Sequence, residues 1–293
     1  MIAQLLANIL VAAAQISLVA VSFTLATMSD LRLFHFAHGA VYATGAYIAF
    51  ALIVGAGLQP WIAISLAILG ASVLGGAVDF GLYSPLRRRR SPPLILLLVS
   101  LGVFVVIQNT IALAFGDETR VLQTSDVRAG MLILGARITP VQLSTIIVGA
   151  AVCAITWTAV RFTSVGKSVR AIADDIQLAR AVGVNTDRTI LLLFVAGSGL
   201  AGAAGLLVGY DTGLTPIMGF RALLLGMTGV IVGGVGTVPG AALGSMVISI
   251  AVNVGAWMLP THWQDGIVFA ILVLFLILRP QGFLGKPLRR ATV

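Results

Sequence analysis

Long apolar runs constrain the fold of this chain more than any other feature of its sequence. A helix that crosses the roughly 30 Å hydrocarbon core of a bilayer needs about 20 mostly apolar residues. Clear candidates lie at residues 5–28, 36–58, 61–83, 94–115, 140–160, 189–210 and 266–278. A further apolar stretch, 222–259, has a glycine- and proline-containing break in its middle. It is either two short spans or a broken re-entrant segment followed by one span, so we expect eight or nine crossings.

The scarcity of charge agrees with a lipid-exposed surface. Charged residues make up 10% of the 293-residue chain, whereas about 25% is usual in a soluble protein, whose surface must stay wet. The N-terminus lacks the charged region of a secretory signal, so the first run is expected to remain as a helix. We predict an all-α, polytopic helical membrane protein that forms a single transmembrane domain over 1–293, with broken or re-entrant helices and a possible internal repeat.

The basic residues predict how this protein lies in the membrane. They cluster at Arg32, at 87–90, at 161–188 and at 279–290. Because cytoplasmic loops carry the excess of Lys and Arg, all four clusters share one side if the N-terminus is outside, the C-terminus is cytoplasmic and the segment 236–240 dips to or through the cytoplasmic side. The net charge of +8 is then a signal of topology, and a nucleic-acid-binding surface is not expected.

The inventory of reactive side chains argues against an enzyme or a metal protein. The chain has one cysteine, Cys153, and three histidines, His35, His38 and His262. His35 and His38 have the i, i+3 spacing that lets two side chains share a helix face and a metal ion, but apart from Asp30 no further ligand lies near them. We expect instead that they cap or hydrogen-bond the start of the second span.

A fragment of a nucleotide-binding motif is also incomplete. Gly166-Lys167-Ser168 has the last residues of a phosphate-binding loop, but Arg161 stands where the first glycine of that motif is required. We therefore expect no catalytic residue, cofactor or metal on this chain.

The polar segment 163–189, between the fifth and sixth spans, contains an amphipathic pattern. Apolar residues at 169, 172, 173, 176 and 179 have helical spacing and predict a helix over 168–180, with Gly183 as its stop. Such a helix either lies on the membrane surface or docks into a soluble partner. Asp174 and Asp175 beside Arg170 and Arg180 favour the partner, since acidic groups gain nothing from anionic lipid.

A glycine-rich run, 233–240, interrupts an apolar stretch where a helix would be expected. Non-helical backbone at membrane depth is tolerated only inside the protein or along a wet cavity. The segment 36–40 is a weaker counterpart in the first half of the chain, and paired breaks of this kind indicate a central permeation site. No titratable group is expected at mid-depth, which counts against an ion-driven carrier. Asp79 is expected to pair with the arginines at 87–90.

Four motifs, in order along the chain, resemble those of ATP-binding-cassette (ABC) transporter permeases of the branched-chain amino acid family (LivH/LivM type, closest to LivH). They are His-Phe-Ala-His-Gly with the tyrosines and glycine that follow (35–47), Ser-Val-Gly-Lys-Ser-Val-Arg-Ala-Ile-Ala-Asp-Asp (164–175), Val-Gly-Gly-Val-Gly-Thr-Val-Pro-Gly-Ala (232–241) and Arg-Pro-Gln-Gly-Phe-Leu-Gly (279–285). His35 replaces the asparagine usual in the family, and Ser29-Asp30 replaces a glycine-containing link. Urea, short amides and other amino acids, which similar permeases transport, therefore stay open as substrates.

The resemblance implies a subunit of an importer in the bacterial inner membrane. Its partners would be a second permease (or a second copy of this chain), a periplasmic substrate-binding protein and two cytoplasmic ATPases, which would bind the ATP and magnesium. Coupling to the ATPases is expected from Gly166, Arg170, Ala171, Asp174, Asp175, Ala179 and Gly183. The substrate pathway is expected along Phe36, His38, Gly39, Tyr42, Gly229, Gly233, Gly234, Gly236, Pro239 and Gly240.

The outer loop, 116–139, is the expected landing surface for the binding protein, because charged groups at such a rim assist encounter. Transport would proceed by alternating access, with the bundle rocking around a cavity between the two broken segments. Two alternatives stay open. A passive channel would need no coupling helix, and an ion-coupled carrier would need a titratable site at mid-depth.

Overall fold

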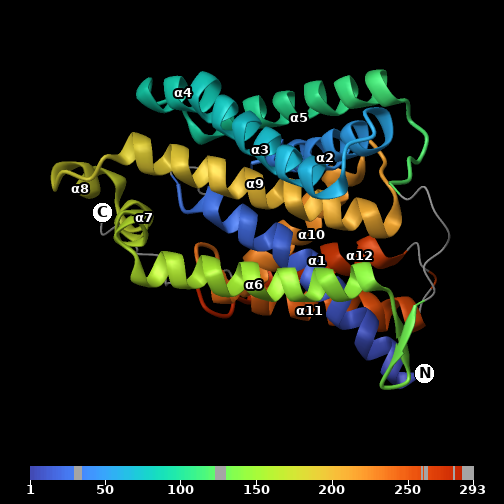
Figure 1. Ribbon diagram of the computed structural model, residues 1–293. Helices are drawn as coiled ribbons and strands as arrows, with labels where there is room; N and C mark the ends of the chain where they lie inside the picture. The colour runs from blue at the N-terminus through green and yellow to red at the C-terminus, as the bar shows by residue number, and fades with distance from the viewer. Residues whose placement is uncertain (30–34, 123–129, 259, 261–262, 280, 286–293) are drawn as a thin grey trace.

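The computed structural model describes residues 1–29, 35–122, 130–258, 260, 263–279 and 281–285. The described chain is almost entirely helical, which confirms the all-α prediction (Figure 1). The α-helices are α1 (Ile2–Thr27), α2 (Ala37–Phe50), α3 (Pro60–Val78), α4 (Ser84–Arg88), α5 (Pro93–Phe115), α6 (Pro140–Phe162), α7 (Ser164–Asp174), α8 (Ile176–Ala181), α9 (Thr186–Thr212), α10 (Met218–Gly233), α11 (Val238–Met258) and α12 (Gln264–Leu278). The π-helical turns η1 (Ala51–Gly55) and η2 (Asp79–Tyr83) extend α2 and α3.

The positions of the long apolar helices agree with the apolar runs predicted from the sequence. Among the described residues, 7 helices are long and apolar enough to span a bilayer, and the shorter α10 and α12 are apolar as well. The third of them is longer than the predicted 61–83, because α3, η2 and α4 form one continuous helix, Pro60–Arg88. These nine helices agree with the predicted eight or nine crossings.

Within the stretch 222–258, the shorter helix α10 and the span-length helix α11 follow each other across a turn. Gly234 and Gly236 turn the chain between α10 and α11 with φ angles of +116° and +80°, values that only glycine adopts readily. A side chain at Gly233 would overlap the carbonyl of Gly240, and one at Gly244 would overlap that of Gly229. Glycine therefore lets the two antiparallel backbones touch.

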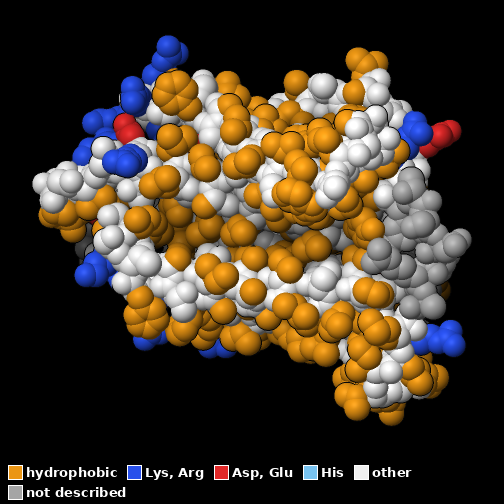
Figure 2. All heavy atoms as spheres, in the orientation of Figure 1, with side chains coloured by type: hydrophobic (Ala, Val, Ile, Leu, Met, Phe, Trp, Pro, Cys, Tyr) orange, Lys and Arg blue, Asp and Glu red, His pale blue; other side chains and the backbone are white. Residues whose placement is uncertain are grey.

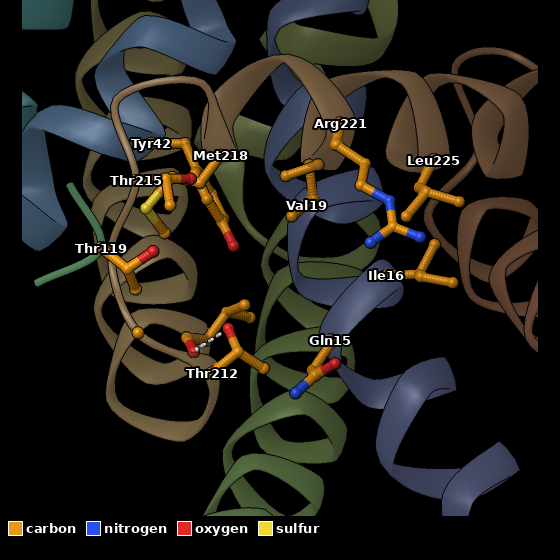
Figure 3. A pocket seen from close by; sticks show the side chains of 13 residues that line it. Gln15, Ile16, Val19, Tyr42, Thr119, Thr212, Thr215, Met218, Arg221 and Leu225 are labelled. Carbon is orange, nitrogen blue, oxygen red and sulfur yellow. Dashed lines mark hydrogen bonds between the residues drawn. The ribbon is translucent and has the colours of Figure 1, made fainter. Parts of the chain in front are cut away.

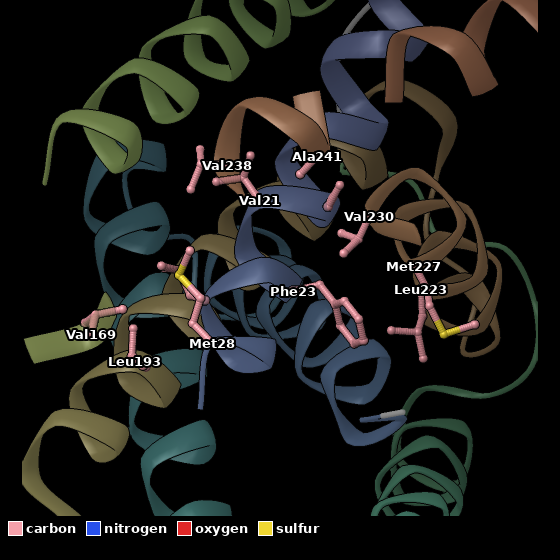
Figure 4. Packing of buried hydrophobic residues seen from close by; sticks show 12 residues of the cluster. Val21, Phe23, Met28, Val169, Leu193, Leu223, Met227, Val230, Val238 and Ala241 are labelled. Carbon is pink, nitrogen blue, oxygen red and sulfur yellow. The ribbon is translucent and has the colours of Figure 1, made fainter. Parts of the chain in front are cut away.

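Helix α1 is the centre of the bundle. In its most apolar 18-residue window 78% of the residues are buried, against 22% for α5 and 17% for α6, which lie at the periphery. Figure 4 shows the largest cluster of buried apolar side chains, in which Phe23 of α1 lies beside Leu223 and Val230 of α10, with Ala241 of α11 close by. The same cluster includes Val169 of α7, so this short helix is anchored on the core.

The two ends of the bundle differ in structure and charge. Helices α4, α7 and α8 lie at one end, called here the α7 end (Figure 1). The N-terminus and a hairpin of two short strands, β1 (Met131–Ile133) and β2 (Ala136–Ile138), lie at the other, the hairpin end. Basic side chains gather over the α7 end in Figure 2, where Arg88 lies 3.4 Å from Asp187. The clusters at 87–90 and 161–188 therefore share one end, as predicted, whereas Arg32 and 286–293 lie outside the described residues.

Candidate functional site

The first candidate site is the surface that α7 and α8 form at the α7 end. Of the predicted apolar face, Val169, Ile172 and Ala179 are buried against the bundle and Ile176 is partly buried, whereas Ala173 is exposed. Val165, Leu178 and Val182 are exposed. Exposed aliphatic side chains beside charged ones are typical of a surface that a protein partner covers.

The helix predicted over 168–180 is interrupted. Asp175 has an extended backbone, with φ −158° and ψ 109°, and separates α7 from α8. Its carboxylate accepts hydrogen bonds from the backbone N–H groups of Gln177 and Leu178 at 2.8 and 3.0 Å. The periodicity concealed this break because Ile172 before it and Ala179 after it are both buried at helical spacing. Asp175 is thus an N-cap, the position at which aspartate is among the most favourable residues.

The other residues of the predicted coupling segment fix its attachment to α6 and its end. A side chain at Gly166 would overlap the carbonyls of Ala159 and Val160. Arg170 donates hydrogen bonds to the carbonyls of Val160 and Arg161. Together these contacts hold α7 at a fixed angle to the end of α6. Ala171 packs, partly buried, beside a core that includes Ala179, and Asp174 is exposed.

Gly183 ends α8, as predicted. Its φ angle is +88°, its N–H donates to the carbonyl of Arg180 at 3.1 Å, and the N–H of Val184 donates to that of Ala179 at 3.0 Å. This pair of bonds is the Schellman motif, which satisfies the last carbonyls of a helix.

The cap at Asp175 gives a first testable prediction. Asp175→Ala removes the acceptor for two N–H groups and should destabilise α8 by about 1 kcal/mol, whereas Asp175→Asn keeps an acceptor and should cost much less. Hydrogen exchange of the amides at 176–181 measures the difference. Equal protection in both variants would contradict the capping role.

The two histidines at the start of α2 bond to neighbouring helices. Nε2 of His38 lies 2.9 Å from Oγ of Ser22 on α1, and Nδ1 of His35 lies 2.9 Å from the hydroxyl of Tyr83 in η2. Both imidazoles are buried. They join the start of the second span to its neighbours by hydrogen bonds, one of the two predicted roles. Among the described residues, no group of three or more metal-ligating side chains comes together.

Asp79 pairs with the arginine cluster, as predicted. Nη1 of Arg87 lies 2.6 Å from Oδ1 of Asp79, and both side chains are nearly inaccessible to solvent. Both residues belong to the long helix formed by α3, η2 and α4, in the part of it that leads to the α7 end.

The two segments predicted to form the substrate pathway differ in structure, although Phe36 of the first packs against a core cluster that includes Val230 and Val238 of the second. Gly234, Gly236 and Pro239 belong to the turn at the α7 end, where a groove of about 500 Å³ separates part of it from Arg170 and Asp174. The N–H groups of Phe283 and Leu284 donate to the last carbonyls of α10 there, at 2.9 and 2.8 Å. The break is therefore at one end of the bundle, and 36–40 is the first turn of α2 rather than an interruption within a helix.

A cavity of about 340 Å³ in the half toward the hairpin end is the second candidate site (Figure 3). Helices α1, α2, α9 and α10 line it, together with Thr119 and the α9–α10 link. Of the predicted pathway residues only Tyr42 faces it, and Gly39 lies next to it, where α2 touches the backbone of Gly219. The remaining pathway assignments stay predictions.

The lining of this cavity, called here the outer-half cavity, is divided by polarity. Aliphatic and thioether groups form one part: Ile16, Val19, Val208, Met218, Ala222 and Leu225. Polar groups form the other: Gln15, Thr119, Thr212, Thr215 and Arg221. Gln15 donates a hydrogen bond to Asp211 at 3.2 Å, so the carboxylate of Asp211, which is not itself part of the lining, contacts a polar residue of the lining. An amphiphilic solute with a short aliphatic chain fits such a lining.

None of these five polar residues was predicted from the sequence to belong to a site. Arg221 and Asp211 were noticeable as charges at the edges of spans, which is the signal that could have found them. Gln15 and the three threonines carry no such signal, because a single polar residue in an apolar helix is common.

The loop 116–139 is more structured than a plain connection. The hairpin β1–β2 pairs Met131 with Ile138, and Gln4 of α1 exchanges two hydrogen bonds with the backbone of Arg137. Arg120 donates to the carbonyl of Phe115 at 2.8 and 3.1 Å. Asp126 and Arg128, which were expected in the landing surface, lie outside the described residues.

Comparison with known proteins gives a consistent result over most of the chain. A sequence model of the family described as "Branched-chain amino acid transport system / permease component" matches residues 5–276. The high-affinity branched-chain amino acid transport system permease protein LivH of Escherichia coli is 32% identical over 287 residues, covering 92% of this chain and 91% of that protein. The corresponding protein BraD of Pseudomonas aeruginosa is 30% identical, covering 97% and 96%.

A solved structure supports the fold alone. The complex "PsaBC from Streptococcus pneumoniae in complex with Fab" contains a chain with a TM-score of 0.51 and 15% sequence identity, covering 94% of this chain and 92% of that one.

Proposed function

The chain belongs to the family of permease components of branched-chain amino acid transport systems, and we propose that it is the membrane-spanning subunit of an ATP-driven importer for small aliphatic amino acids. In this proposal the α7 end faces the cytoplasm and the hairpin end faces outside. The N-terminus is then outside, the C-terminus cytoplasmic, and the membrane is the bacterial inner membrane. The excess of arginine at the α7 end supports this orientation.

The observation that carries the proposal is the position of the two candidate sites at opposite ends of one bundle. The cavity has aliphatic and polar walls suited to an amphiphilic solute, and the α7–α8 surface has charged and aliphatic groups suited to a partner. Val169 joins α7 to the core cluster around Phe23 of α1. Because α7 packs on α6 and α9, and both of these pack on α1, a force on α7 reaches the central helix through its neighbours.

The proposed cycle has the partners that this arrangement requires. Two cytoplasmic ATPases bind ATP and magnesium, close on each other and displace α7 and α8. A second permease, or a second copy of this chain, completes the membrane portion, and a binding protein delivers solute at the hairpin end. Alternating access follows when the displaced bundle closes the outer-half cavity to the outside and opens it inward.

Reconstitution tests the proposal. Proteoliposomes that contain the permease pair are supplied with loaded binding protein outside and with the ATPases and ATP inside. Labelled leucine should accumulate only when both ATPase and ATP are present. Uptake that continues unchanged without the ATPases would contradict the proposal and favour a channel or an ion-coupled carrier, and competition by urea but not by valine would contradict the substrate class.

A further inference from the structure

Arg221 is the only charged side chain among the described residues that line the outer-half cavity. Resting on the proposed function, we propose that Arg221 binds the carboxylate of the transported amino acid, and that Asp265 is the counter-ion which this carboxylate displaces. Figure 3 shows Arg221 reaching from α10 into the cavity toward Ile16 of α1.

The bonds of Arg221 leave capacity for a ligand. Its Nε donates to Oδ1 of Asp265 at 3.2 Å, and its Nη2 donates to Oε1 of Gln264 at 3.1 Å. A guanidinium group carries five N–H donors in a planar fork, and these two bonds use two of them. A carboxylate that takes the place of Asp265 can therefore bond the freed Nε–H and a second, parallel N–H, the geometry for which arginine is best suited.

The pair of Arg221 and Asp265 is suited to exchange. The two side chains are 59% and 63% exposed, and an ion pair with this exposure contributes little to stability. The buried pair of Arg87 and Asp79 is the contrast within the same chain. A substrate carboxylate can replace Asp265 at low cost, because water solvates the released aspartate.

The rest of the cavity recognises the other parts of an aliphatic amino acid. Gln15, Thr119, Thr212 and Thr215 offer oxygen atoms that can accept hydrogen bonds from an ammonium group. Ile16, Val19, Met218 and Leu225 offer an apolar surface for a branched side chain. A zwitterion with a short aliphatic side chain has a group for each part of the lining: a carboxylate for Arg221, an ammonium for the oxygen atoms and a side chain for the apolar surface. Urea and short amides have no anionic group that could bind Arg221.

Direct binding tests this assignment without relying on transport. The permease complex is purified in detergent, and saturable binding of labelled leucine is compared with that of labelled leucinol, which has the same side chain and ammonium but no carboxylate. Arg221→Gln should raise the dissociation constant of leucine about 10- to 100-fold and leave that of leucinol nearly unchanged. Arg88→Gln, at an exposed, ion-paired arginine outside the cavity lining, is the matched control and should change neither.

The role of Asp265 as counter-ion predicts a separate effect on leucine binding. Asp265→Asn removes the competitor for Arg221, so it should tighten leucine binding severalfold in the wild-type background and have no effect when Arg221→Gln is already present. Arg221→Lys keeps the charge but loses the planar fork, and it should recover part of the affinity.

Three results would overturn the assignment: no saturable leucine binding by the wild-type complex, unchanged leucine affinity in Arg221→Gln, or equal losses for leucine and leucinol. These outcomes are distinct from failure of the proposed function. Leucine binding that depends on Arg221, in a complex whose uptake ignores ATP, would reject ATP-driven import and retain the carboxylate site.

Discussion

Replacing Arg87 with methionine is expected to lower the free energy of unfolding by about 3–5 kcal/mol. Arg87 lies 2.6 Å from Asp79, and the two side chains are only 8% and 2% exposed. Without the guanidinium, the carboxylate stays buried with no opposite charge to offset its lost hydration. The unfolding equilibrium of the purified permease in mixed detergent micelles measures the loss.

The neighbouring arginine is a matched control. Arg88 pairs with Asp187 at 3.4 Å, and its side chain is 72% exposed, so Arg88→Met should cost less than about 1 kcal/mol. The double variant Asp79→Leu with Arg87→Met removes both charges and should recover most of the stability. Equal losses for the Arg87 and Arg88 variants would show that burial does not decide the strength of these pairs.

Replacing Gly233 with leucine is expected to separate α10 from α11 and abolish uptake. A side chain there would overlap the carbonyl of Gly240, and a backbone atom cannot rotate away as a flexible side chain can. Overpacking of this kind costs about 1–3 kcal/mol or more. Thermal unfolding and ATP-driven leucine uptake in proteoliposomes give the two readouts.

A glycine on the lipid side is the control for this substitution. Gly102, on α5, has no heavy atom within 4 Å of the position that a Cβ would occupy. Gly102→Leu should therefore leave uptake and stability close to those of the wild type. Normal uptake by Gly233→Leu, or equal damage in both variants, would contradict the role given to the α10–α11 contact.

The helices could be predicted from the sequence because membrane spans depend on length and hydropathy, both of which are local. The turn at Gly234 and Gly236 could be predicted for the same kind of reason, since several glycines and Pro239 in a short run oppose a helix. The charge pattern placed 236–240 on the side of the basic clusters, and the turn lies at that end, beside Arg170. Its assignment to a central pathway could not be checked from the sequence, because the depth of a break depends on where α10 begins.

The interruption at Asp175 was missed because an N-cap within an amphipathic pattern looks like one more polar residue. The outer-half cavity was missed for a different reason. Gln15, Tyr42, Thr119 and Arg221 come from segments far apart in the sequence, and only the packing of α1, α2, α10 and the link after α5 brings them together. The buried pair of Asp79 and Arg87 was predictable, because its members are close in sequence on one helix.

Thiol labelling in oriented vesicles tests the central claim that solute enters at the hairpin end while a cytoplasmic partner acts on α7 and α8. Single cysteines at Leu132, in β1, and at Leu178, in α8, are placed in a Cys153→Ser background, since Cys153 is the one native cysteine. With a membrane-impermeant maleimide, the cysteine at 132 should react only in right-side-out vesicles and that at 178 only in inside-out vesicles, where added ATPase should protect it. Labelling of position 178 from the outside of right-side-out vesicles would contradict the account.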